Sequence, residues 1–193
     1  MRVVAGEARG RRLRAPAGRV TRPTSDRVRE AIFDTLSCIT DLDGAVVVDL
    51  FAGSGALGVE ALSRRAGSVT FVELDRAALD AIRANLEVVG AVVGAGGRAA
   101  VVRADALAWA AGRPPTARAD LVLADPPYRF DRWSDLAGAL AAWAGLVVLE
   151  SGAELDLGPS WQTLRVRCYG ATVVTVARPD PSPGTRTQPK GGT

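Results

Sequence analysis

The chain has 193 residues and a net charge of +3; 48% of its residues are hydrophobic and 23% are charged, as in an ordinary globular domain. It shows neither a signal peptide nor the roughly 18 consecutive apolar residues of a membrane span, so we expect a cytoplasmic protein without a membrane partner. Histidine is absent, which excludes Ser-His-Asp triads, histidine zinc sites and imidazole acid–base chemistry.

Positive charge gathers in the first thirty residues. This stretch has nine arginines against three acidic residues, a local charge of +6, whereas the rest of the chain sums to −3. Planar guanidinium groups suit phosphates and base edges, so the pattern indicates a polyanion such as RNA. Because the chain has one lysine, a compositional bias toward arginine is the alternative. The predicted RNA contacts are Arg9, Arg11, Arg12, Arg14 and Arg27.

The predicted elements form an α/β domain over residues 21–178. A basic two-stranded β-hairpin is expected within residues 1–20, and the Pro- and Gly-rich residues 179–193 are expected to be a disordered tail. A helix begins near Asp26, and strands then alternate with helices. Strands are predicted at 46–50, 69–74, 99–103, 120–124 and 145–150, helices at 57–66, 76–87, 105–111 and 132–143, and an antiparallel strand pair at 163–168 and 172–177. This alternation predicts a Rossmann-like, seven-stranded, mostly parallel sheet with helices on both faces.

Two further patterns concern the interior. The helix at 132–143 places Trp133, Leu136, Leu140 and Trp143 on one stripe, which we interpret as core packing and not as a ligand site. The two cysteines, Cys38 and Cys168, lack metal-ligand spacing. They are therefore expected to be buried, reduced thiols, and no metal is predicted.

A glycine loop follows the first strand of the alternating region. Gly53, Gly55 and Gly58 match GxGxxG between a β-branched run and a helix, a pattern shared by dinucleotide-binding and methyltransferase sheets. Asp49 distinguishes the two, because an acid before the loop would repel a pyrophosphate but can pair with the ammonium of S-adenosylmethionine. Glu73, at the end of the next strand, can accept bonds from two ribose hydroxyls.

The third strand is followed by Asp105 and Ala106. The Asp105 carboxylate can accept from an adenine amino group while the Ala106 N–H faces the ring; a helix N-cap is the alternative for Asp105. The predicted cofactor site also includes the neighbouring residues Phe51, Ser54 and Leu74.

The tetrad Asp125-Pro126-Pro127-Tyr128 follows another apolar strand and is the candidate catalytic motif. An amine on an aromatic base is a poor nucleophile because its lone pair is delocalised into the ring. If the Asp125 carboxylate and the Pro126 carbonyl accept its N–H bonds, the lone pair is aimed at the methyl group. The prolines fix the backbone, and Tyr128 can stack on the base.

The chain resembles the RsmD family of bacterial 16S ribosomal RNA guanine-N2 methyltransferases, which are class I S-adenosylmethionine enzymes. The resemblance rests on RVVAGEARGRRL, RPTSDRVREAIFDTL, DLFAGSGALGVEALSR, FVELD, DPPY, VVLES and YGATVV. It implies cofactor binding by Asp49, the 53–58 loop, Glu73 and Asp105, catalysis at DPPY, and a guanine of the small ribosomal subunit, or of its assembly intermediate, as the target.

We expect the methyltransferase to be a monomer. Three other functions are alternatives. An adenine-N6 methyltransferase would use the same tetrad on a different base. A non-catalytic RNA-binding assembly factor would have no need for an intact glycine loop and DPPY. A nicotinamide dehydrogenase is disfavoured by Asp49 and by the absence of histidine. For Arg27, the candidate ligands are the cofactor's carboxylate or an RNA phosphate, and a surface helix arginine is the alternative.

Overall fold

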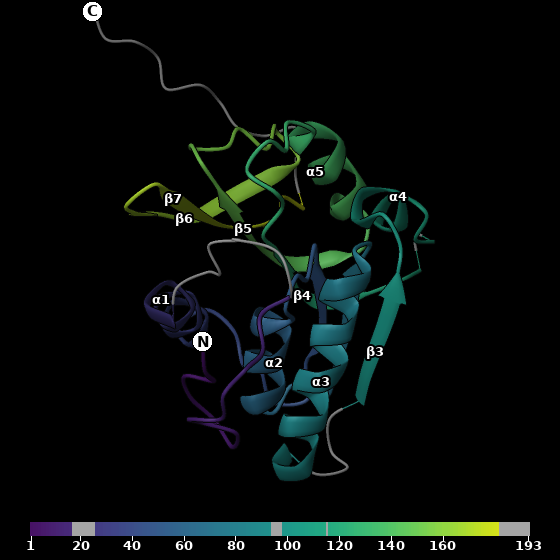
Figure 1. Ribbon diagram of the computed structural model, residues 1–193. Helices are drawn as coiled ribbons and strands as arrows, with labels where there is room; N and C mark the ends of the chain where they lie inside the picture. The colour runs from purple at the N-terminus through teal and green to yellow at the C-terminus, as the bar shows by residue number, and fades with distance from the viewer. Residues whose placement is uncertain (17–25, 94–97, 115, 182–193) are drawn as a thin grey trace, which may run out of the picture.

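A seven-stranded sheet forms the centre of the computed structural model, which describes residues 1–16, 26–93, 98–114 and 116–181 (Figure 1). Its strands are β1 (Val46–Leu50), β2 (Ser68–Glu73), β3 (Arg98–Arg103), β4 (Ala119–Ala124), β5 (Ala144–Ser151), β6 (Trp161–Tyr169) and β7 (Thr172–Pro179). The helices are α1 (Asp26–Ser37), α2 (Ala56–Ser63), α3 (Arg76–Val93), α4 (Ala106–Ala111) and α5 (Trp133–Ala141).

The strand order is β3-β2-β1-β4-β5-β7-β6. Strands β1 to β5 pair in parallel, while β7 runs antiparallel to both β5 and β6. After β3 the chain returns to the other side of β1, so the order reverses between β1 and β4. Ligands of such sheets bind beyond the carboxyl ends of the strands at this reversal. The predicted α/β fold class is confirmed.

Helices cover both faces of the sheet (Figure 1). Helices α1, α2 and α3 bury Phe33, Leu62 and Ile82 against one face, and α4 and α5 bury Leu107 and Leu140 against the other. Because β1 is covered on both sides, its sequence is an apolar run and not an alternating pattern. Helix α2 ends at Ser63, earlier than the predicted residue 66, and the chain leaves it through Arg65 with a left-handed φ of 72°.

Residues 1–16, which we call the N-terminal segment, pack on α2 and α3. Instead of two strands, the segment forms a single antiparallel bridge between Arg2 and Arg12. Its Val3, Ala8 and Leu13 side chains are buried in the core beneath the segment. The predicted boundary at residue 20 falls outside the described residues.

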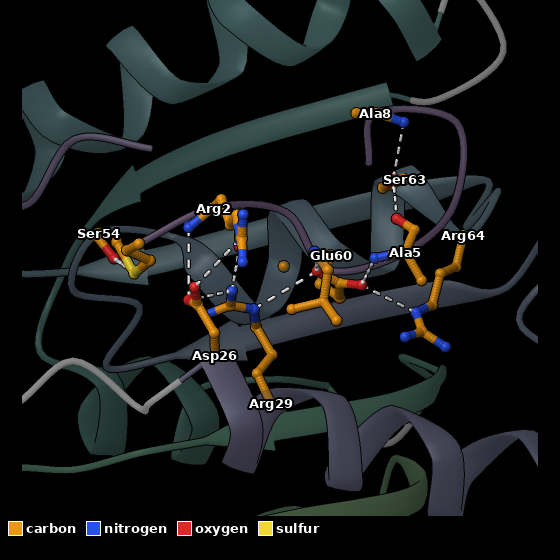
Figure 2. A network of polar contacts seen from close by, with 12 residues as sticks. Arg2, Ala5, Ala8, Asp26, Arg29, Ser54, Glu60, Ser63 and Arg64 are labelled. Carbon is orange, nitrogen blue, oxygen red and sulfur yellow. Dashed lines mark hydrogen bonds and ion pairs between the residues drawn. The ribbon is translucent and has the colours of Figure 1, made fainter. Parts of the chain in front are cut away.

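The segment is attached through its backbone to side chains of α2 (Figure 2). The Glu60 carboxylate accepts from the N–H groups of Val4 at 2.8 Å and Ala5 at 2.9 Å. Ser63 Oγ accepts from Ala8 N–H and donates to the Ala5 carbonyl. Beneath these bonds the fully buried Arg29 is 3.5 Å from Glu60. The segment is therefore docked on the domain by a buried polar network.

The structure corrects two further expectations. Both Cys38 and Cys168 are exposed; Cys168 lies on β6, the edge strand, so the prediction of buried thiols is wrong. Pro179, assigned to the tail, is the last residue of β7, and residues 182–193 lie outside the described part of the chain. Over the described ranges, no helix combines the length and the apolar character needed to cross a membrane.

Gly58 fixes how closely α2 approaches the sheet. A Cβ at this position would lie 2.3 Å from Phe71 Cε1 and 2.9 Å from Val69 Cγ1. Both neighbours are buried and have little room to move. We predict that Gly58→Ala lowers the free energy of unfolding by about 1–3 kcal/mol, the usual effect of overpacking a core.

The matched control is Gly138→Ala in α5, where an added Cβ would meet nothing within 4 Å. This substitution should be neutral or should stabilise the protein by up to about 1 kcal/mol, because alanine favours a helix over glycine. Denaturant unfolding of both variants measures the difference, and equal midpoints would contradict the packing argument.

Candidate functional site

A cavity of about 630 Å³ opens at the carboxyl ends of β1, β2, β4 and β5. Its size suits a nucleotide-like ligand together with part of a second group. Its wall includes the predicted residues Asp49, Phe51, Gly53, Ser54, Glu73, Asp125, Pro126, Pro127 and Tyr128. A second hollow of about 460 Å³ shares Phe51, Glu73 and Pro127 with the first, and adds Leu74, Asp105 and Ala106. The sheet topology thus brings the predicted cofactor and catalytic residues to one place.

The glycine loop turns sharply between β1 and α2. Phe51, Gly53 and Gly55 all have left-handed φ angles, of 56°, 56° and 75°. Gly53 lines the cavity, whereas Gly55 is the N-cap residue of α2 and packs near Ile82 and Phe71. Gly55 and Gly58 do not line the cavity; Gly55 forms the turn before α2, and Gly58 lets α2 pack closely on the sheet.

Asp49 is buried in the wall of the cavity, with 1% of its surface exposed. Its carboxylate accepts from the Gly58 N–H at 2.9 Å, which ties the end of β1 to the first turn of α2. Burial raises the pKa of Asp49 well above its usual value; the charges of Asp125 and Glu73 raise this pKa further, and the Gly58 hydrogen bond only partly offsets them. A cation entering the cavity would favour the ionised form.

Glu73 stands between the two hollows and lines both. Its carboxylate accepts three backbone N–H bonds, from Gly53 at 2.8 Å, Leu74 at 2.8 Å and Asp75 at 2.9 Å. The bond to Gly53 spans twenty residues and holds the glycine loop against the end of β2. Glu73 therefore orders the loop in addition to presenting oxygen acceptors.

Asp105 caps a helix, which was the alternative to its predicted contact with adenine. It is the N-cap residue of α4 and accepts from the Ala108 N–H at 2.8 Å. The side chain is exposed at the rim of the second hollow, beside Ala106. A cap that uses one carboxylate oxygen leaves the other oxygen available for an amino group.

The tetrad extends from the end of β4 across the cavity. Asp125 is half-buried, Pro126 is buried, and Tyr128 is 89% exposed. The Pro127 carbonyl accepts from the Phe130 N–H at 2.8 Å, which closes a turn after the two prolines. The exposed Tyr128 ring lies near Gly152 and is open on the solvent side, as a stacking platform requires.

An aromatic group on the cavity wall was missed by the sequence interpretation. Phe130 contacts Phe51 edge to face, with ring centroids 5.2 Å apart, and contacts Trp133 in the same way at 5.0 Å. Leu136 and Leu140 are core residues as predicted, but Trp133, the first residue of α5, lines the cavity. The predicted apolar face of this helix is correct. Periodicity alone, however, cannot distinguish a residue of that face that packs in the core from one that lines a cavity.

Glu150 was missed as well. It ends the apolar run of β5, is 4% exposed and lines the cavity. The parallel register pairs Ala124 with Leu149, which places Asp125 and Glu150 at adjoining strand ends. The sequence does contain a signal for Glu150: it is an acid at the end of an apolar strand, at the same sheet edge as Asp49 and Asp125.

The predicted RNA-contacting arginines lie apart from the cavity wall. Arg9, Arg11, Arg12 and Arg14 are exposed on the N-terminal segment, and Arg27 is exposed on α1. From the same segment, Met1, Ala15 and Pro16 do line the cavity. The structure thus separates outward-facing arginines from inward-facing apolar residues along one stretch of chain.

A family model described as "Conserved hypothetical protein 95" matches residues 1–178. "Putative rRNA methyltransferase YlbH" of Bacillus subtilis is 36% identical over 186 residues, which cover 91% of this chain and 97% of that protein. "Ribosomal RNA small subunit methyltransferase D" of Escherichia coli (strain K12) is 41% identical over 131 residues, which cover 67% of this chain and 61% of that protein. The solved structure "Putative methyltransferase yhhF from Escherichia coli" has a TM-score of 0.78 and 32% identity, covering 93% of this chain and 98% of that one. The chain therefore belongs to this family, the RsmD family of methyltransferases that its motifs resemble.

Proposed function

We propose that the protein transfers a methyl group from S-adenosylmethionine to the N2 amine of a guanine in 16S ribosomal RNA. The observation that carries this proposal is the meeting of Asp49, Glu73 and Asp125 in one cavity at the carboxyl ends of three strands. The relatives named above as ribosomal RNA methyltransferases support RNA as the substrate.

The donor set of the cavity fits S-adenosylmethionine. Asp49 offers a buried negative charge to the ammonium group, and Glu73 offers oxygens to the ribose hydroxyls. Asp105 and Ala106 would meet the adenine in the second hollow, beside the apolar Phe51 and Leu74 side chains. When bound, the cofactor supplies an electrophilic methyl group on a sulfonium.

The acceptor half of the cavity would hold the target amine. The Asp125 carboxylate and the Pro126 carbonyl accept its two N–H bonds, which pulls the nitrogen toward tetrahedral geometry and frees its lone pair. The nitrogen–carbon bond would form as the carbon–sulfur bond breaks, with S-adenosylhomocysteine leaving as a neutral thioether, and the now acidic nitrogen would lose one proton to Asp125 or water. Tyr128 stacks on the base, which has been drawn out of its neighbours' stack.

Glu150 supports guanine over adenine as the target base. Guanine carries an N1–H donor beside its N2 amine, whereas adenine carries an N1 lone pair beside its N6 amine. A buried carboxylate next to Asp125 can accept the guanine N1–H while Asp125 accepts from the amine. The same carboxylate would face the adenine N1 lone pair, an unfavourable contact at low dielectric.

The exposed arginines of the N-terminal segment would contact RNA phosphates. They are Arg9, Arg11, Arg12 and Arg14, joined by Arg27 on α1. Guanidinium groups neutralise phosphates and release counterions, which supplies affinity without base specificity. The buried residues of the segment fix the direction in which these side chains point.

The test is to incubate small-subunit RNA, taken from cells lacking the enzyme, with purified protein and methyl-labelled cofactor. Digestion to nucleosides and mass spectrometry identify the modified base. We expect N2-methylguanosine at one position. N6-methyladenosine would contradict the choice of base, and a protein that binds neither cofactor nor RNA in calorimetry would contradict the proposed function.

Substituting Glu150 by Gln should lower kcat/KM by about 10- to 100-fold, because a hydrogen bond to a charged group is lost. The diagnostic substrate has 2-aminopurine at the mapped position, which retains the 2-amine but lacks N1–H. For the wild type, kcat/KM should be lower with 2-aminopurine than with guanine by a similar factor. The amide of the variant can donate to N1 of 2-aminopurine, so the variant should show similar kcat/KM values with the two bases. Equal discrimination by both proteins would remove Glu150 from base recognition.

Cofactor affinity should depend on pH through Asp49. Only the ionised carboxylate attracts an ammonium, and the raised pKa of Asp49 leaves it partly neutral between its usual value of 3.8 and the raised one. Affinity for S-adenosylhomocysteine should therefore rise with pH through this interval and level off above it.

The control for this pH dependence is Asp49→Asn. This variant should bind more weakly and should show a flat profile wherever the ligand's amino group stays protonated. Since an ionised buried carboxylate opposes folding, the variant should also be more stable than wild type above the raised pKa. Calorimetry across pH measures the first effect, and a wild-type profile in the variant would argue against an Asp49–ammonium pair.

A further inference from the structure

Asn85 of α3 connects the N-terminal segment to the cofactor loop. It is fully buried, and both the oxygen and the nitrogen of its side-chain amide make hydrogen bonds. Its Oδ1 accepts from the Arg14 N–H at 2.7 Å, and its Nδ2 donates to the Arg14 carbonyl at 3.0 Å. The same Nδ2 donates to the Ser54 carbonyl at 2.8 Å. One side chain thus fixes the backbone of an arginine-bearing residue and the backbone of the glycine loop.

The connected parts both reach the cavity. Ser54 lies in its wall, and so do Ala15 and Pro16, the residues directly after Arg14. At the other end of the segment, Met1 also lines the cavity, and its Sδ is 3.8 Å from Ser54 Oγ (Figure 2). A displacement of the segment would therefore remove part of the cavity wall and the contact between Met1 and Ser54 Oγ, and Asn85, which holds the Ser54 carbonyl, would lose its bonds to Arg14.

The segment has one β-bridge of its own and is otherwise ordered by side chains of α2 and α3. Its buried Val3, Ala8 and Leu13 side chains keep it on the domain, so a ligand on its arginines would act by ordering the docked segment. The guanidinium groups of Arg9, Arg11, Arg12 and Arg14 already face outward in the docked arrangement. Phosphates bound to them do not need the segment to leave, so RNA would favour the docked state.

We propose that Asn85 is a positioning residue that couples RNA held on the N-terminal segment to the affinity of the cofactor site. This inference rests on the proposed function, because it takes RNA and S-adenosylmethionine as the two ligands. RNA on the arginines stabilises the docked segment, Asn85 passes that order to Ser54, and the loop binds cofactor more tightly. By linkage, cofactor tightens RNA binding by the same factor.

The experiment measures the coupling factor directly. The dissociation constant of S-adenosylhomocysteine is determined by calorimetry with full-length protein, alone and with saturating transcribed 16S RNA. We expect RNA to tighten binding about fivefold or more in wild type, within the usual range of coupling between sites. Asn85→Ala should reduce the factor to about one while both ligands still bind.

Ser63→Ala is the matched control. Ser63 is fully buried and bonds the segment at Ala5 and Ala8, but it does not touch the glycine loop. This variant loosens docking without cutting the link to Ser54, so its coupling factor should stay within about twofold of wild type. Loss of coupling in Ser63→Ala to the same extent as in Asn85→Ala would overturn the assignment to Asn85.

A measurement on the wild type tests the inference independently, in case the Asn85 variant does not fold. Hydrogen exchange of the backbone amides of residues 52–58 should slow when RNA is added without cofactor, because the loop becomes more ordered. Unchanged exchange, or weaker binding of S-adenosylhomocysteine with RNA, would overturn the inference. Failure of wild type to bind either probe would instead contradict the proposed function.

Discussion

The parallel register of β1 with β2 and β4 is the constraint on which the rest of the site depends. Leu50 pairs with Val72 on one side and with Ala124 on the other, so Glu73 and Asp125 follow the two neighbouring strands at the level where β1 enters the glycine loop. Side chains alternate along a strand, so a slip of one residue would send these carboxylates to the opposite face of the sheet. Alternate residues of β1, β2, β4 and β5 pack into two different core clusters, one on each face, so a slip would exchange the side chains packed in each cluster. Packing of the core therefore positions the chemistry at its edge.

The cavity is lined by the carboxylates of Asp49, Glu73, Asp125 and Glu150, and placing them together opposes folding. Backbone N–H groups limit this cost: Asp49 receives one bond and Glu73 receives three. The raised pKa of Asp49 shows that the compensation is incomplete. A cationic ligand would compensate the remaining negative charge. The site therefore favours a ligand with an ammonium or sulfonium group. In this way the stability of the site and its ligand preference have one physical origin.

Local sequence patterns predicted the strands, turns and helices whose structure depends mainly on neighbouring residues in the chain. A β-branched run before GxGxxG requires a strand, a turn and a helix, and a strand before Asp125 places that residue at the sheet edge. Residues whose role arises from distant contacts were not predictable in this way. Asn85 in α3 looks like any polar helix residue until Arg14 and Ser54 are brought to it. The docking of the N-terminal segment on Glu60 and Ser63, 55 to 58 residues away in the chain, likewise has no local signal.

In the proposed function the cavity has two halves with different tasks, a cofactor half around Asp49 and Glu73 and an acceptor half around Asp125 and Tyr128. The most direct test of this division is the single-turnover rate of methyl transfer by Asp125→Asn at saturating cofactor, measured beside its affinity for S-adenosylhomocysteine. Asparagine keeps the shape of the side chain but offers one acceptor oxygen and no negative charge. The rate should fall on the order of 10²–10³-fold, as when one aligned hydrogen-bonding group is removed from a transition state, with cofactor affinity nearly unchanged. A variant that transfers the methyl group at close to the wild-type rate would contradict the assignment of Asp125 to the reacting amine.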